Sequence, residues 1–179
     1  SDMAKRNLVK VALSVTTLDA KLARTMEPRA STPSKRLEAM KLLSDAGVPT
    51  GVMVAPIIPA LNDSEIEKIL TGAHYAGAQS AGFVLLRLPL EIKDLFEDWL
   101  KENTPDRAER VMSLIRSTRG GKAYDSDFSQ RMRGTGPYAW QISRRFEIAC
   151  TRLGLNRGKW KVDSSKFAVP GRGKQLALL

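Results

Sequence analysis

Three short apolar runs alternate with helical patterns along the first half of the chain. Residues 8–15 (LVKVALSV), 50–56 (TGVMVAP) and 81–88 (AGFVLLRL) are rich in Val and Leu and contain few polar positions. Nearly continuous apolar runs of this length are typical of strands that are buried on both faces of a parallel sheet. The alternation of strand and helix predicts an α/β fold of about three parallel strands with right-handed crossovers.

The helical segments between these runs carry start signals. Apolar residues recur every four positions over residues 18–26. A second helix is predicted to begin at Thr32, where a capping hydroxyl precedes Pro33. The segment 62–65 (NDSE) offers capping side chains for a third helix, whose apolar face spans residues 66–73.

Beyond Pro89 the strand signal ends and the pattern becomes helical. Apolar stripes predict helices over residues 92–99, 108–115 and 142–153, and a connection rich in Gly and Arg spans residues 119–137. The chain after these helices is basic and punctuated by Gly and Pro, which predicts a tail that wraps the body.

The positive charge is confined to the second part of the chain. Of a net charge of +10, residues 1–104 contribute nothing, with 13 Lys and Arg against 13 Asp and Glu, whereas residues 105–179 carry 16 against 6. We therefore predict two parts: a sheet-bearing domain (1–104) and a basic helical extension with its tail (105–179). Such a region suits a polyanion, although a solvated basic surface gives the same composition.

Composition also excludes several classes of site. No run of about eighteen apolar residues and no charged-then-apolar leader is present, which predicts a cytoplasmic protein without a membrane partner. Cys150 is the single cysteine and cannot alone form an internal disulfide or a thiolate metal cage. No Ser/His/Asp set accompanies the sole histidine, His74, so hydrolytic chemistry is unsupported.

Several blocks of the sequence resemble radical S-adenosylmethionine (SAM) proteins of the spore photoproduct lyase-like branch. EPRAST, RLEAMKLLSDAG and GVMVAPIIPALND follow one another between Glu27 and Asp63, and the similarity continues through LLRLPLE, RMRGTGPYAW and RRFEIACTRLGL. The resemblance implies a partial (β/α) barrel of the radical SAM type with a C-terminal helical extension. It also implies that SAM is cleaved at a [4Fe–4S] cluster to give a 5′-deoxyadenosyl radical, with DNA repair as the candidate activity.

The cluster-binding motif of that family is missing from this sequence. The family holds its cluster with a Cys-x3-Cys-x2-Cys loop after the first barrel strand, whereas Cys150 lies in the helical extension. We therefore expect the chain to be the C-terminal portion of such an enzyme, truncated or proteolysed. SAM and the cluster would be cofactors of the full-length protein, and this chain by itself is expected to be inactive.

Residues that follow each predicted strand are candidates for ligand contact, because ligands bind at the carboxyl ends of parallel strands. After the first strand these are Ser14, Thr16, Thr17 and Asp19, whose hydroxyls and carboxylate suit a ribose and an ammonium group. The resemblance implies that this segment contacts the ribose of SAM. The residues alone leave another interpretation open, in which Asp19 caps a helix and the threonines close a turn.

Arg36 lies in the first turn of a predicted helix, where a cation is unfavourable beside the helix dipole, so an anion is expected nearby. The resemblance implies that this arginine faces the carboxylate of SAM. The alternative is a structural ion pair with Glu27 or Asp19. Ala55 and Pro56, after the second strand, are predicted to form an apolar wall against the adenine ring.

Further cations are predicted to bind substrate or nucleic acid. Arg87 is the only charge in the third predicted strand, so we expect it to face the barrel lumen and contact an anion. The basic extension sets cations beside aromatic residues, which is the composition of a nucleic-acid surface. A noncatalytic nucleic-acid-binding module and a barrel enzyme with a phosphate-bearing substrate stay open as alternatives. The candidate nucleic-acid contacts are Arg131, Arg133, Arg144 and Arg145.

Overall fold

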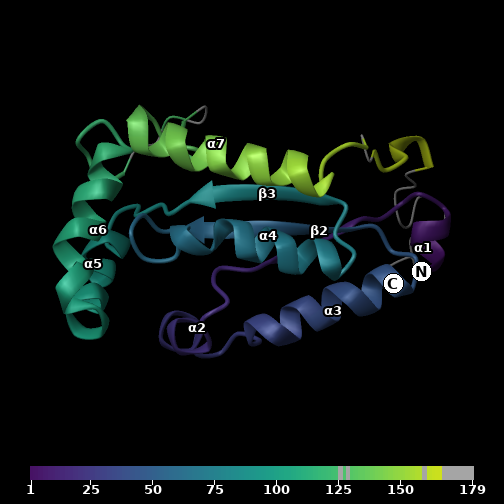
Figure 1. Ribbon diagram of the computed structural model, residues 1–179, viewed down its shortest axis with the longest axis horizontal. Helices are drawn as coiled ribbons and strands as arrows, with labels where there is room; N and C mark the ends of the chain where they lie inside the picture. Colours follow the sequence, from purple (N-terminus) through teal and green to yellow (C-terminus); the bar gives the residue numbers. More distant parts are fainter. Residues whose placement is uncertain (125–126, 128–129, 159–160, 167–179) are drawn as a thin grey trace, which may run out of the picture.

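The chain folds around a three-stranded parallel sheet (Figure 1). The computed structural model describes residues 1–124, 127, 130–158 and 161–166. The strands are β1 (Val11–Ser14), β2 (Thr50–Ile57) and β3 (Ser80–Leu85), in the order β1-β2-β3. Both pairings are parallel. The predicted fold class is therefore confirmed.

Helices fill the connections between the strands and most of the described chain beyond β3. The Thr32 hydroxyl accepts a hydrogen bond from the Lys35 N–H at 3.4 Å, and Pro33 follows it as the first helical residue, as predicted. The apolar pattern does not predict the first short helix, because that helix buries no residue. The helices are α1 (Asp2–Lys5), α2 (Ala20–Met26), α3 (Pro33–Asp45), α4 (Ile66–Tyr75), α5 (Ile92–Asn103), α6 (Pro105–Ser117) and α7 (Gly136–Leu153), with 3-10 turns η1 (Asp63–Glu65) and η2 (Ser164–Lys166).

One face of the sheet is packed against helices. Val52 and Val54 of β2 and Phe83 of β3 share a buried core with Ile69 of α4 and Phe146 of α7. The rings of Phe83 and Phe146 lie 4.8 Å apart between centroids. Residues at alternate strand positions point to this face, and α7 lies alongside α4 and β3 (Figure 1).

A second core lies between the α5–α6 hairpin and the segments that follow the strands. Ile58, just after β2, and Leu88, after β3, are buried with Leu100 of α5 and Ile115 of α6. The hairpin stands at the end of the sheet toward which the strand arrows point (Figure 1). The carboxyl ends of the strands are therefore bordered by a helical wall.

Two strands are shorter than predicted. β1 begins at Val11, and β3 ends at Leu85, so Arg87 lies beyond the strand and not inside it. The pairing of β2 with β3 shifts register between Val54 and Ile57, on either side of Pro56, which has no N–H to donate. An apolar run indicates which residues are buried, and in this chain residues stay buried beyond the ends of the hydrogen-bonded strands.

The outer edge of β3 is closed by other parts of the chain. The Asn156 side chain accepts from the Ala81 N–H at 2.9 Å and donates to the Ala81 carbonyl at 3.0 Å. Further along, the Leu85 N–H donates to the Met132 carbonyl at 2.9 Å. Arg119 donates to the Leu85 carbonyl at 3.4 Å. These groups take the places that a neighbouring strand would occupy.

Candidate functional site

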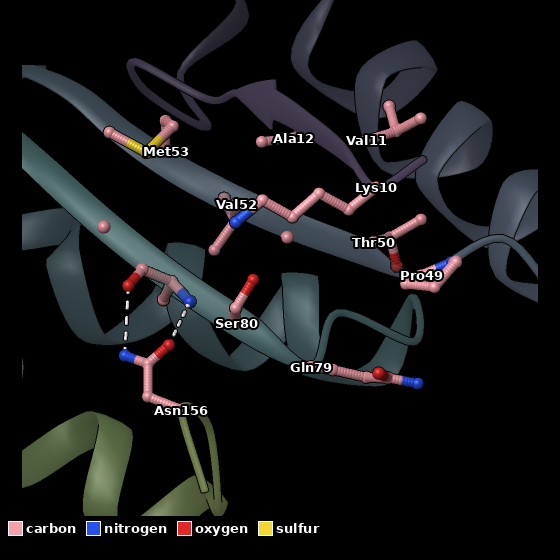
Figure 2. Close-up of a pocket in the computed structure, with 13 residues that line it drawn as sticks. Lys10, Val11, Ala12, Pro49, Thr50, Val52, Met53, Gln79, Ser80 and Asn156 are labelled. Atoms are coloured by element: carbon pink, nitrogen blue, oxygen red, sulfur yellow. Dashed lines mark hydrogen bonds between the residues drawn. The ribbon is translucent and has the colours of Figure 1, made fainter. Parts of the chain in front are cut away.

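The face of the sheet opposite the helical core is hollowed near the amino ends of the strands (Figure 2). Ala12, Gly51 and Ser80 lie side by side in the three strands and form its floor. The hollow measures about 310 Å³, and the Lys10 side chain extends across it. A Cβ on Gly51 would come within 2.4 Å of the Ser80 hydroxyl and 3.1 Å of the Ser80 carbonyl oxygen, so a larger residue there would require Ser80 to shift. None of the predicted site residues lines this hollow.

The predicted residues cluster instead at the carboxyl end of β1, where alternation divides them between two faces. Val15 is fully buried in the helical core, and Thr17 hydrogen-bonds to Glu65 at the start of α4. Because side chains alternate along a strand, Ser14, the last residue of β1, belongs to the opposite face, whereas Thr16 lies beyond the strand and is buried. Ser14 is exposed on that face.

Arg36 and Glu27 form an ion pair at this strand end. The guanidinium Nη2 donates to Glu27 Oε2 at 2.8 Å, Nη1 to the Ser14 carbonyl at 3.0 Å, and Nε to the Ser31 carbonyl at 2.9 Å. Thr16 also approaches Glu27 Oε2, at 3.4 Å, although its hydroxyl donates more closely to the Ala55 carbonyl, at 3.0 Å. The sequence suggested Glu27 or Asp19 as the partner of Arg36, and the structure shows the pair with Glu27.

Glu65 holds the turn after β1, and sequence reasoning did not identify this role. Its carboxylate accepts from the Thr17 hydroxyl and from the Leu18 N–H, both at 2.6 Å. The Thr17 hydroxyl in turn accepts from the Asp19 N–H at 3.0 Å. Thr17 is 1% exposed and its single donor is used, so this geometry favours the turn-closing interpretation of Thr17 over a contact with a cofactor.

Asp19 caps α2. Its Oδ1 accepts from the Lys21 and Leu22 N–H groups, at 2.7 and 3.2 Å. The residue lines a hollow of about 230 Å³ that Glu65 and Arg107 also line, whereas Glu27 lines another hollow on the far side of α2. The structure therefore brings together Ser14, Thr16 and Arg36, but it does not bring Asp19 into the same hollow as Glu27.

Asn62 joins the ends of β1 and β2. Its amide donates to the Thr16 carbonyl at 2.8 Å and to the Pro56 carbonyl at 3.0 Å, and its oxygen accepts from the Ile58 N–H at 2.7 Å. The side chain is 2% exposed. Ala55 and Pro56 therefore lie beside the cluster formed by Ser14, Glu27 and Arg36. The sequence predicted that they form an apolar wall against the adenine ring.

The segment 62–65 was predicted to cap the following helix, and this expectation is wrong. Neither Asn62 at η1 nor Glu65 at α4 makes a side-chain capping bond. Their side chains reach the strand ends instead, and Asp63 accepts a hydrogen bond from the Tyr138 hydroxyl at 2.5 Å. Burial raises the pKa of Tyr138 to about 12, with a further contribution from the Asp63 carboxylate.

Arg87 finds a partner outside the strands. Its Nη2 donates to the Tyr124 hydroxyl at 3.2 Å, and the guanidinium lies 5.8 Å from the centre of the Tyr124 ring. Among the described residues, Nε of Arg87 has no acceptor although it is buried. The contact of Arg87 with a substrate anion stays a prediction.

The four arginines proposed for nucleic acid differ in their surroundings. Arg145 forms two hydrogen bonds with Glu67, at 2.8 and 2.7 Å, and these hold the pKa of Glu67 below its usual range. Arg133 lies over the Phe83 ring at 4.7 Å, and Arg131 is partly buried. Arg144 is exposed on α7, one helical turn from Trp140, which is 69% exposed.

The residues of this chain do not fit an iron–sulfur cluster. Cys150 is the single cysteine, it is 5% exposed, and burial raises the pKa of its thiol to about 11. In the described part of the chain, no three His, Cys, Asp or Glu side chains gather as metal ligands.

None of the described helices has the length and apolarity that crossing a membrane requires.

Similar proteins cover parts of this sequence. One uncharacterized protein of Mycobacterium tuberculosis and one of Mycobacterium bovis are each 31% identical over 118 residues, which is 65% of this chain and 35% of either relative. The chain thus spans about a third of the length of these relatives. An uncharacterized protein of Acidianus two-tailed virus is 41% identical over 54 residues, 30% of this chain and 18% of that protein. No solved structure matches the chain.

A family match covers the sheet end described above. It extends over residues 1–71, which include β1, β2 and the Ser14, Glu27 and Arg36 cluster. The family is one whose members use SAM and a [4Fe–4S] cluster. Residues 1–71 of this chain match the radical SAM superfamily.

Proposed function

We propose that this chain supplies the SAM-binding part of a radical SAM enzyme of the spore photoproduct lyase-like branch. The observation that carries the proposal is the cluster at the carboxyl end of β1. Arg36 binds the Glu27 carboxylate and the Ser14 carbonyl there, and Ser14 is an exposed residue, all within the segment that matches the superfamily. SAM offers complementary groups: an amino-acid end and a ribose.

Arg36 is suited to bind the carboxylate of SAM. Of the five N–H donors of a guanidinium, its bonds to described residues use one on each nitrogen. One N–H remains on each terminal nitrogen, and a carboxylate binds two such donors in a bidentate pair. The side chain is 15% exposed and is fixed by three acceptors, so little rotamer freedom is left to lose on binding.

Ser14 and the apolar residues beside it are suited to the nucleoside. The exposed Ser14 hydroxyl can bond to a ribose oxygen. Ala55 and Pro56 lie inside β2, near its end and not after it as predicted, and offer an apolar surface to the adenine ring. The backbone of these strands is fixed by Asn62, so the contacts are held on rigid elements.

This chain's part in the reaction is to bind and orient SAM. A [4Fe–4S] cluster needs three cysteine thiolates, and the sequence contains one cysteine. This chain therefore cannot hold the cluster that would donate an electron to SAM. In the complete enzyme we place SAM cleavage to a 5′-deoxyadenosyl radical outside the groups described here.

We further propose that the substrate is DNA. The proposal is supported by the charge of residues 105–179, which carry 16 Lys and Arg against 6 Asp and Glu. The exposed Trp140 can stack on a base, and Arg144 beside it can bind phosphate. Arg144 also pairs with Glu147, at 3.6 Å on the exposed surface, whereas Arg145 is held by two hydrogen bonds to Glu67.

Calorimetric titration of the chain with S-adenosylhomocysteine tests the SAM proposal without any cluster. We expect binding that weakens about tenfold or more in Arg36→Met, because a charge-assisted bidentate pair is lost. Lys41→Met, which removes an exposed cation from α3, is the control. Absence of binding to the unaltered chain would refute the proposal. In the full-length protein, reconstituted anaerobically, formation of 5′-deoxyadenosine tests the reaction.

A further inference from the structure

Arg87 lies at the end of the sheet where ligands of parallel sheets bind. It follows the carboxyl end of β3, which is at Leu85. The connection between α6 and α7 packs against this end, because the Leu85 N–H donates to the Met132 carbonyl and Arg119 donates to the Leu85 carbonyl. Tyr124 belongs to the same connection and contacts Arg87 there.

The guanidinium of Arg87 has fewer acceptors than its burial requires. Its Nη2 donates to the Tyr124 hydroxyl at 3.2 Å, and this is its one hydrogen bond to the described residues. Nε is buried without an acceptor, and no described carboxylate forms an ion pair with this arginine. The carbonyls of Leu85 and Leu86 accept from Arg119. A partly buried cation without a counter-charge is unfavourable, so folding alone does not explain this position.

The remaining donors of this pair suit a phosphate. A guanidinium has five N–H groups, and Arg87 uses one of them within the described chain. Nη1 keeps two N–H groups and Nη2 keeps one, so the outer end of the guanidinium can bind two phosphate oxygens in a bidentate pair. The Tyr124 hydroxyl accepts from Arg87, and its own proton can therefore donate to the same anion.

The same end of the sheet adjoins the helix that carries Trp140. Gly134, just before α7, lies against the Leu85 side chain at the end of β3. α7 therefore begins at the carboxyl end of this strand (Figure 1). Trp140 lies in the early part of α7 and is 69% exposed, so its ring is accessible to an unpaired base. A DNA segment stacked on Trp140 would thus lie at the end of the sheet where Arg87 offers its free donors.

We propose that Arg87 and Tyr124 bind a phosphodiester group of single-stranded DNA at the carboxyl end of β3. The inference rests on the proposed function, because it assumes that the substrate is DNA. It places one substrate phosphate at the edge of the sheet opposite the groups proposed for SAM, which lie at the end of β1. It also gives Tyr124 a binding role.

The competing explanation is that Arg87 only holds the connection between α6 and α7 against the sheet, through its contact with Tyr124. Both explanations allow Arg87→Met to weaken DNA binding. They differ in the salt dependence of binding, because a lost phosphate contact reduces the number of counterions released, whereas a packing defect does not. They also differ for Arg87→Lys, which keeps the charge and loses the bidentate geometry.

The experiment is filter binding of a short oligothymidylate across a salt series. We expect Arg87→Met to weaken binding about tenfold at low salt and to reduce the slope of log affinity against log salt by about 0.7. Arg87→Lys should weaken binding about threefold with the slope retained. Tyr124→Phe removes a neutral donor, so it should weaken binding about threefold without changing the slope. Arg6→Met, which removes an exposed cation before the amino end of β1, is the control.

The outcomes separate the inference from the DNA proposal. If the unaltered chain binds the oligonucleotide and Arg87→Met keeps the full slope, the inference is overturned while the DNA proposal stands. An equal loss of slope in Arg6→Met also overturns it, since any surface cation would then have the same effect. Should Arg87→Met fail to fold, unaltered affinity in both Arg87→Lys and Tyr124→Phe overturns the inference. If the unaltered chain does not bind the oligonucleotide, the DNA proposal fails and the inference with it.

Discussion

The carboxylate of Glu65 stabilises the turn between β1 and α2 from a segment that lies 47 and 48 residues further along the chain. It accepts from the Thr17 hydroxyl and the Leu18 N–H at 2.6 Å each. Thr17 is 1% exposed, so water cannot replace the carboxylate without a local opening. Glu65→Ala removes both acceptors while leaving both donors in place.

The expected loss follows from those two donors. A hydrogen bond to a charged group contributes about 1.5–3 kcal/mol, and a buried donor left without an acceptor costs about 1–3 kcal/mol. Partial exposure of Glu65 admits some water and reduces the total. We therefore expect Glu65→Ala to lower the free energy of unfolding by about 3 kcal/mol, a large fraction of the 5–15 kcal/mol typical of domains. Glu65→Gln, which keeps one acceptor, should cost about half as much.

Urea denaturation followed by circular dichroism measures these free energies. Glu38→Ala is the matched control, since Glu38 is a carboxylate on α3 that is 55% exposed and pairs with Lys35. It should change the free energy of unfolding by less than about 0.5 kcal/mol. Hydrogen exchange adds a local measure, because the Leu18 amide should lose protection in Glu65→Ala. An equal effect of Glu65→Ala and Glu38→Ala would refute the reasoning.

Two other predictions follow from contacts of α7. The folded pKa of Tyr138, about 12, exceeds its ordinary value, so the stability that the group contributes is complete below about pH 10 and lost as the pH rises through 12. The stability difference between the unaltered chain and Tyr138→Phe, measured in urea, should therefore shrink between pH 10 and 12; a constant difference would contradict this. In filter binding to single-stranded DNA, Arg144→Ala should reduce the slope of log affinity against log salt by about 0.7. Arg145→Ala should leave it unchanged because Arg145 is paired with Glu67, and binding without salt dependence would contradict the DNA proposal.

The strands and their direction could be predicted because burial leaves a local trace. A run such as residues 50–56 is apolar at nearly every position, since one side of β2 faces the helical core and the other is only partly exposed. The start of α3 was also readable, because Thr32 and Pro33 act within one helical turn. The exact strand ends were not, since they depend on which backbone groups find partners across the sheet.

The arrangement of the site could be predicted only in part, because its decisive contacts are long-range. Thr16 and Thr17 are adjacent in the sequence, yet one hydroxyl donates to Ala55 and the other to Glu65. Both residues lie beyond the end of β1, so alternation along the strand does not separate them. Nothing local identifies Glu65 as the partner, because in sequence it resembles a helix-capping residue.

The two edges of the sheet have different consequences for the site. At β3 the outward backbone groups of Ala81 are taken by Asn156, so another strand could pair there only by displacing that side chain. At β1 the N–H groups of Val11 and Val15 donate to the segment 49–53, so Ser14 between them turns its carbonyl to the opposite edge, where Arg36 binds it. A strand added to this sheet would therefore have to join at β1, beside Arg36. The Glu27–Arg36 pair would then lie at the seam between the sheet described here and any added strand. A ligand held by that pair could contact groups from both sides of the seam.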